Sequence, residues 1–69
     1  MQVRLIVKGN KFQAARAAAD RGIGFVFERE TGSDTVGLCN ATIEELNRWV
    51  CEDTKPPFPV GSLLLWTAI

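Results

Sequence analysis

Strand-like and helix-like patterns alternate along nearly the whole of this chain, in the order strand, helix, strand, strand, helix, strand. They extend from Val3 to about Ala68, so they leave no separate segment for a catalytic insertion. A chain of 69 residues makes one domain near the lower size limit for folding alone. The sequence therefore predicts a single α+β domain over residues 1–69.

The first part of the chain predicts a half-buried strand followed by a capped helix. Apolar and polar residues alternate over Gln2–Lys8, which is the period of a strand with one buried face. Asn10 is a favourable N-cap, and Gln13 stands at the position that completes a capping box. We expect the helix over Lys11–Arg21, with one face formed by Phe12, Ala15, Ala18 and Ala19.

The middle of the chain predicts a hairpin and a second helix. Two strands, Ile23–Glu30 and Thr35–Cys39, flank a turn cluster of hairpin length. Thr42 and Glu45 have the spacing of a second capping box. The apolar stripe expected on this helix is Ile43, Leu46 and Val50, with Trp49 at its margin.

The last strand is expected over Ser62–Ala68, after a stiff proline-containing connector at 55–59. Simple alternation would direct Leu63, Leu65 and Thr67 to one side, and Leu64, Trp66 and Ala68 to the other. Both sides are then apolar, which is unusual for a solvated edge strand. Either this strand lies more centrally and is covered, or it forms a contact surface.

Two helices among four strands predict a two-layer sandwich of the ferredoxin-like type. In that arrangement both helices cover one face of a four-stranded antiparallel sheet. Right-handed crossovers place the first and third strands centrally and the second and fourth at the edges. We expect the bulk of the core to come from Phe12, Phe25, Phe27, Leu46 and Trp66.

The residue types argue against catalysis and against a membrane span. The chain has no histidine or tyrosine, no phosphate loop, and no nucleophile or metal-ligand motif. Cys39 and Cys51 are too few for a disulfide scaffold, so we expect reduced thiols in the cytoplasm. Arg4 and Lys8 interrupt the first apolar run, which excludes a signal segment there. We expect no enzyme, no cofactor, no metal and no membrane association.

Charge is balanced overall but divided along the chain. Residues 1–27 hold five basic residues and one acidic residue, a net charge of +4, and residues 28–69 carry −4. The basic side chains that would contact a nucleic acid are Arg4, Lys8, Lys11 and Arg16. The expected central strands carry no stacking aromatic residue, and the chain has no excess of positive charge. Weak nucleic-acid binding is therefore an alternative hypothesis.

The residues that we expect to bind a protein partner are Phe58, Leu64 and Trp66. Tryptophan is enriched at binding hot spots, and apolar patches on small soluble domains are typical of interfaces. The leading hypothesis is a small protein-interaction module. A structural homodimer, joined edge to edge through the last strand, is a further alternative.

Taken whole, the chain resembles the small accessory proteins encoded by bacteriophages and prophages. The likeness lies in the short capped helices, in the start Met1-Gln2-Val3-Arg4-Leu5, and in the ending Pro56-Pro57-Phe58-Pro59-Val60-Gly61-Ser62-Leu63-Leu64-Leu65-Trp66. Such proteins commonly bind a host macromolecule, often to inhibit it. The resemblance therefore implies an inhibitor or modulator of a host protein.

Overall fold

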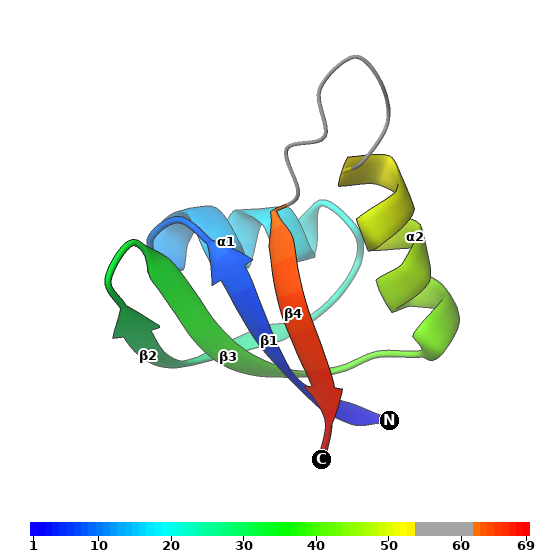
Figure 1. Cartoon of the computed structure of the whole chain (residues 1–69). Coiled ribbons are helices and arrows are strands. Elements are labelled where there is room, and N and C mark those ends of the chain that lie inside the picture. Colours follow the sequence, from blue (N-terminus) through cyan, green and yellow to red (C-terminus); the bar gives the residue numbers. More distant parts are fainter. Residues whose placement is uncertain (54–61) are drawn as a thin grey trace.

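The computed structural model describes residues 1–53 and 62–69 (Figure 1), and six regular elements lie in these ranges in the predicted order. The elements are β1 (Gln2–Lys8), α1 (Lys11–Ala19), β2 (Phe25–Thr31), β3 (Asp34–Asn40), α2 (Ile43–Asp53) and β4 (Leu63–Ala68). The expected proline connector and Phe58 lie outside the described residues.

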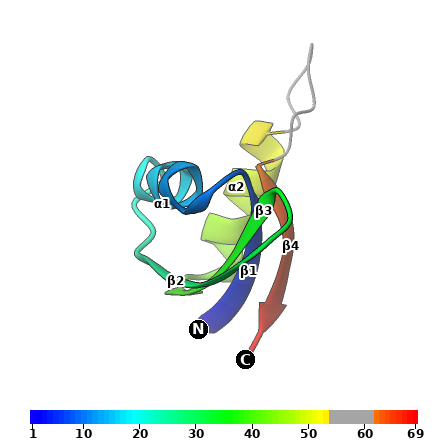
Figure 2. The same ribbon diagram turned by 90° about the vertical axis from the view of Figure 1, so that its left-hand side faces the viewer.

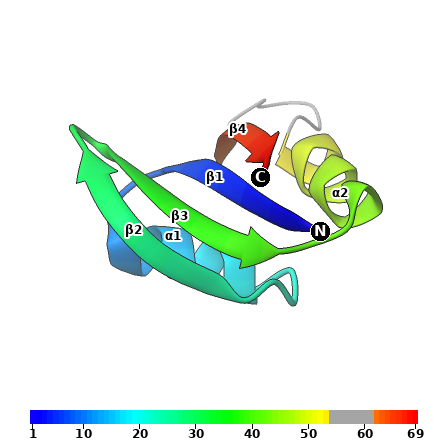
Figure 3. The same ribbon diagram turned by 90° about the horizontal axis from the view of Figure 1, so that it is seen from below.

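The four strands form one antiparallel sheet in the order β2-β3-β1-β4. β1 and β3 are central and β2 and β4 are the edges, as right-handed crossovers predict. Both helices lie on one side of the curved sheet (Figures 2 and 3), α1 over β2, β3 and β1, and α2 beside β4. No described helix covers the other side, which we call the open face.

Both helices begin with the predicted capping boxes. The side chain of Asn10 accepts from the backbone N–H of Gln13, and the Gln13 side chain accepts from the N–H of Asn10, both at 2.9 Å. Thr42 and Glu45 make the same two bonds at 3.0 and 3.1 Å. These bonds satisfy N–H groups that have no partner within the helix. α1 ends at Ala19, two residues before the expected end.

The core lies between the helices and the sheet. Its fully buried apolar members are Val3, Leu5, Val7, Ala14, Ala18, Leu46 and Trp49. Trp49 is the largest of them, although the helix pattern predicted it at the margin. Its indole N–H donates to Oγ of Ser62 at 2.7 Å, and the guanidinium of Arg21 lies 4.8 Å from its ring centroid. The polar end of the indole is therefore satisfied inside the core.

Two of the aromatic residues expected in the core are exposed instead. Phe12 is 74% exposed because it lies about 140° around α1 from Ala14 and Ala18, which form the buried stripe. Alanine at the buried positions allows the helix to approach the sheet closely. Phe27 is 45% exposed because it lies on the edge strand β2, which has a neighbouring strand on one side only.

The buried stripe of α2 is also displaced from the expected one. Leu46 and Trp49 are fully buried, whereas Ile43 is 54% exposed and Val50 is 37% exposed. The helix is therefore rotated so that the large indole faces the sheet. This rotation places the greatest apolar area of the helix in the core.

β4 does not alternate as predicted, because its register shifts by one residue. Leu63 pairs with Val7, whereas Leu65 already pairs with Ile6, so Leu64 is an extra residue in the strand. The bulge reverses the alternation. Leu63 and Trp66 consequently face the helices, and Leu65 and Thr67 belong to the open face.

Candidate functional site

Besides polar side chains such as Lys8, Arg29 and Asn40, the open face of the sheet carries apolar ones that a fully solvated face would lack. Strand pairing places Ile6, Val26, Val36, Leu38 and Leu65 on it. Val26 is 65% exposed and Leu65 is 56% exposed, while Ile6 and Leu38 are half-buried. Val36 is fully buried within this face, outside the helix-side core. An exposed apolar face on a small domain is typical of an interaction surface.

One ion pair crosses this face. Nε of Arg4 lies 3.1 Å from Oε2 of Glu28, and Nη2 lies 3.3 Å from Oε1. Glu28 is the extra residue in a bulge of β2, between Phe27 and Arg29. Since both side chains are partly exposed, the pair contributes only about 0.2–1 kcal/mol to stability. Its main effect is to neutralise the charge of Arg4, which lies beside Ile6 on its own strand and opposite Leu38 on β3.

The open face continues into a depression of about 520 Å³ at the end of the sheet where β2 begins. The residues that line it are Gln2, Gly24, Phe25, Val26, Leu38, Cys39 and Asn40. Val26 and Leu38 belong to both the depression and the open face. A hollow of this size and lining can accept an apolar side chain of a partner.

The two edges of the sheet differ in composition. β2 carries Glu28, Arg29 and Glu30 in succession beside its bulge, and such charges and bulges oppose pairing with a further strand. At the other edge, residues 62–69 include no charged side chain. Leu65 and Ile69 are 56% and 66% exposed there. β4 is therefore the edge that is chemically suited to contact with another chain.

Three residues were predicted to bind a protein partner, and the two that the structure describes, Leu64 and Trp66, lie at this edge. Leu64 is 49% exposed at the bulge of β4. Trp66 is half-buried and packs against the core from the helix side. Trp66 therefore does not belong to the open face, and Phe58 lies outside the described residues.

Sequence reasoning missed the open-face residues Ile6, Val26 and Leu38. A signal for two of them was present, because Ile6 interrupts the polar positions of its strand and Leu38 follows Val36 at strand spacing. Alternation within a strand shows which residues share a side of that strand, but not which sides of different strands lie together. The register between strands was needed to show that they gather on the side away from the helices.

The four basic residues considered for nucleic-acid binding do not form one surface. Arg4 and Lys8 occupy open-face positions of β1, and Arg4 is paired with Glu28. Lys11 and Arg16 lie on α1, on the other side of the sheet.

Lys11 lies between two exposed aromatic rings. Its Nζ is 5.3 Å from the ring centroid of Phe12 and 5.7 Å from that of Phe27. Both distances are in the range of cation–π attraction, which is worth about 0.5–1 kcal/mol at an exposed site. These exposed rings and the ammonium between them form a second cluster, separate from the open face.

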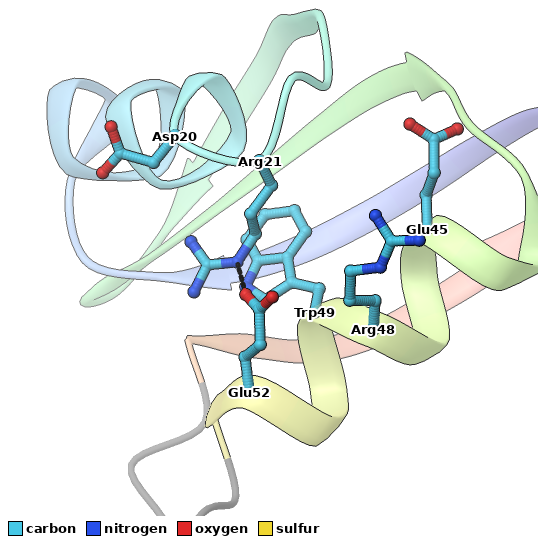
Figure 4. A pocket seen from close by; sticks show the side chains of 6 residues that line it. All are labelled: Asp20, Arg21, Glu45, Arg48, Trp49 and Glu52. Atoms are coloured by element: carbon cyan, nitrogen blue, oxygen red, sulfur yellow. Dashed lines mark ion pairs between the residues drawn. The ribbon is translucent and has the colours of Figure 1, made fainter.

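A small polar cleft of about 210 Å³ separates the end of α1 from α2 (Figure 4). Its lining residues are Asp20, Arg21, Glu45, Arg48, Trp49 and Glu52. Arg21 lies over the Trp49 ring, and its Nε is 3.7 Å from Oε2 of Glu52. Arg21 thereby connects the end of α1 to α2, so the cleft is explained by the packing of the fold.

The two cysteines have contrasting environments, and both carry thiols. Burial, and to a smaller extent the negative charge of Glu45, raise the pKa of the Cys39 thiol above its ordinary value of 9.0. Cys51 is exposed. In residues 1–53 and 62–69, no group of three or more His, Cys, Asp or Glu side chains could hold a metal ion.

Neither described helix has the length and apolar character needed to span a membrane. The chain matches no protein-family model, no curated protein and no solved structure.

Proposed function

We propose that this protein is a small non-catalytic module that binds a partner protein on the open face of its sheet. The observation that supports this most directly is the exposure of Val26 and Leu65 beside the half-buried Ile6 and Leu38. A partner that covers these side chains removes apolar area from water, which stabilises a complex by roughly 25 cal/mol per Å². The depression beside Val26 offers a place for an anchoring side chain of the partner.

We also assign the fold to the ferredoxin-like class. The order β2-β3-β1-β4, the antiparallel pairing and the position of both helices on one side support this assignment. Of the two faces of the sheet, the open face is the one that the described helices leave uncovered.

The likeness to phage and prophage accessory proteins supports a host protein as the partner, with inhibition or modulation as the result. Two cysteines that carry thiols, of which Cys51 is exposed, support a reducing compartment such as the cytoplasm. The partner would then be a cytoplasmic protein with an apolar surface complementary to the open face.

The proposal is tested by capture from a nuclease-treated lysate of the organism that encodes the protein. Val26→Lys places a charge on the open face and, because Val26 is 65% exposed, leaves the fold intact. Phe12→Lys is the matched control, because Phe12 is similarly exposed but lies on α1. We expect a protein that is retained by the wild type and by Phe12→Lys, and lost with Val26→Lys. Equal retention by all three proteins would contradict the proposal.

Single-stranded nucleic acid is the second candidate ligand, supported by the cluster of Lys11, Phe12 and Phe27. Exposed aromatic rings beside a cation are suited to base stacking and phosphate contact. A labelled single-stranded oligonucleotide, titrated at two salt concentrations, tests this candidate. Binding that weakens steeply with salt and is lost in Phe12→Ala would support it. Binding that is unchanged in Phe12→Ala would exclude this cluster as the site.

A further inference from the structure

We propose that two copies of this protein pair through β4, so that their sheets join into one continuous antiparallel sheet. The occupant of the β4 edge is then β4 of a second copy, related to the first by a two-fold axis at Thr67. This pairing does not depend on the proposed partner protein, since it concerns the purified chain alone.

The backbone of β4 presents hydrogen-bonding groups to the outside of the sheet. The N–H of Ile69 donates to the carbonyl of Gln2 at 2.9 Å, so Ile69 is oriented toward β1. Because this orientation alternates along an antiparallel strand, Thr67 is directed toward β1, and Trp66 and Ala68 direct their N–H and C=O groups outward. Within the described residues, no strand pairs with β4 on that side.

A two-fold axis at Thr67 places side chains of the two β4 strands opposite one another, and their sizes are complementary. On the helix side, the large Trp66 of one copy lies opposite the small Ala68 of the other. On the open face, Leu65 lies opposite Ile69, and these residues are 56% and 66% exposed in the single chain. Thr67 meets its own copy at the axis, and Thr–Thr is a favourable cross-strand pair. The segment 65–69 also avoids the bulge at Leu64.

Charge favours this edge for self-pairing. Residues 62–69 have no charged side chain, so two copies of the strand meet without opposition of like charges. Across the sheet from Thr67, the nearest charged side chain is that of Arg4 on β1, which is paired with Glu28. Three strand spacings, about 14 Å, would separate Arg4 from its own copy, which exceeds the Debye length of about 8 Å at physiological salt. β2, with Glu28, Arg29 and Glu30, lacks this property.

The pairing has a consequence for the open face. Joining the sheets at β4 places Leu65 of each copy near the middle of one apolar surface. The surface would then extend from Val26 of one copy to Val26 of the other. A dimer would present twice the apolar face of the single chain, on the side away from both pairs of helices.

Sedimentation equilibrium of the purified full chain, from micromolar to millimolar concentration, tests the pairing. We expect the apparent mass to rise toward twice the monomer mass of 7.6 kDa. Ala68→Pro removes one outward N–H at a position where an edge strand tolerates proline, and should weaken association by about tenfold or more. Ala68→Ser, which retains the N–H, is its control. Circular dichroism confirms that each variant is folded.

A charge-exchange experiment makes the test independent of Ala68. Thr67→Lys and Thr67→Glu each place two like charges at the axis, so each alone should associate at least about tenfold more weakly. Mixing the two variants should restore the dimer. Thr31→Lys, an exposed substitution on the far edge strand β2, should associate like the wild type. The proposal would be overturned if the wild-type protein stays monomeric or if the mixed variants do not associate. It would also be overturned by a dimer that is lost with Val26→Lys but not with Ala68→Pro.

Discussion

Replacing Trp49 by phenylalanine should lower the free energy of unfolding by about 2–3.5 kcal/mol. The substitution removes the hydrogen bond from the indole N–H to Ser62, which is worth about 0.5–1.5 kcal/mol. It also weakens the contact with Arg21, worth about 0.5–1 kcal/mol, and leaves part of a fully buried volume empty at a cost of about 1 kcal/mol. A domain of this size has only about 3–5 kcal/mol of stability. The variant should therefore fold but unfold at a much lower urea concentration.

A double-mutant cycle isolates the hydrogen bond. Ser62→Ala alone should cost about 0.5–1.5 kcal/mol, because the indole N–H loses its acceptor at 2.7 Å. The loss of stability in the double variant should be smaller than the sum of the two single losses by about 1 kcal/mol. The assay is urea unfolding followed by circular dichroism, with Trp66 fluorescence as a second probe in the Trp49→Phe proteins. Costs that simply add would refute the assigned role of the indole N–H.

Three further predictions concern the sheet and the thiols. Gly37→Ala should lower the stability by about 1–3 kcal/mol or more in urea unfolding, because a Cβ at this position would overlap the Phe25 ring and lie 2.7 Å from a backbone oxygen. Phe27→Ala should cost only about 1–2 kcal/mol in the same assay, since the ring is 45% exposed; a cost of 3–5 kcal/mol would mean that it is buried. Cys51 should react with a thiol reagent well before Cys39, and equal rates would contradict the burial of Cys39. Above pH 9.0 the unfolded state loses the Cys39 proton while the folded state retains it, so stability should fall with rising pH, and this fall should be absent in Cys39→Ala.

Local signals in the sequence were sufficient for the elements and their order. The capping boxes at Asn10 and Thr42 depend on residues three apart, and the structure confirms both. The hairpin turn depends on Gly32, whose φ of +59° is the positive value that the first residue of a two-residue type II′ loop requires. The crossover rule then placed β1 and β3 at the centre of the sheet.

The sequence was less informative about which face of each element is buried. In α1 the largest apolar residue, Phe12, was expected inside, but two alanines are buried and allow a closer approach to the sheet. In β4 a single bulge at Leu64 reversed every later side chain, and nothing in the composition of the strand marks this position. The open face depends on this bulge and on pairing between strands far apart in the sequence.

The most direct measurement of the central claim is site-specific photo-crosslinking in the organism that encodes the protein. A photoreactive side chain at position 26 lies on the open face, and the same group at position 12 lies on α1. We predict that position 26 crosslinks to one partner protein and that position 12 does not. The mass of the adduct should differ from twice 7.6 kDa, which is the mass of two crosslinked copies of this chain. A partner captured from position 12 and not from position 26 would contradict the claim that the open face is the binding surface.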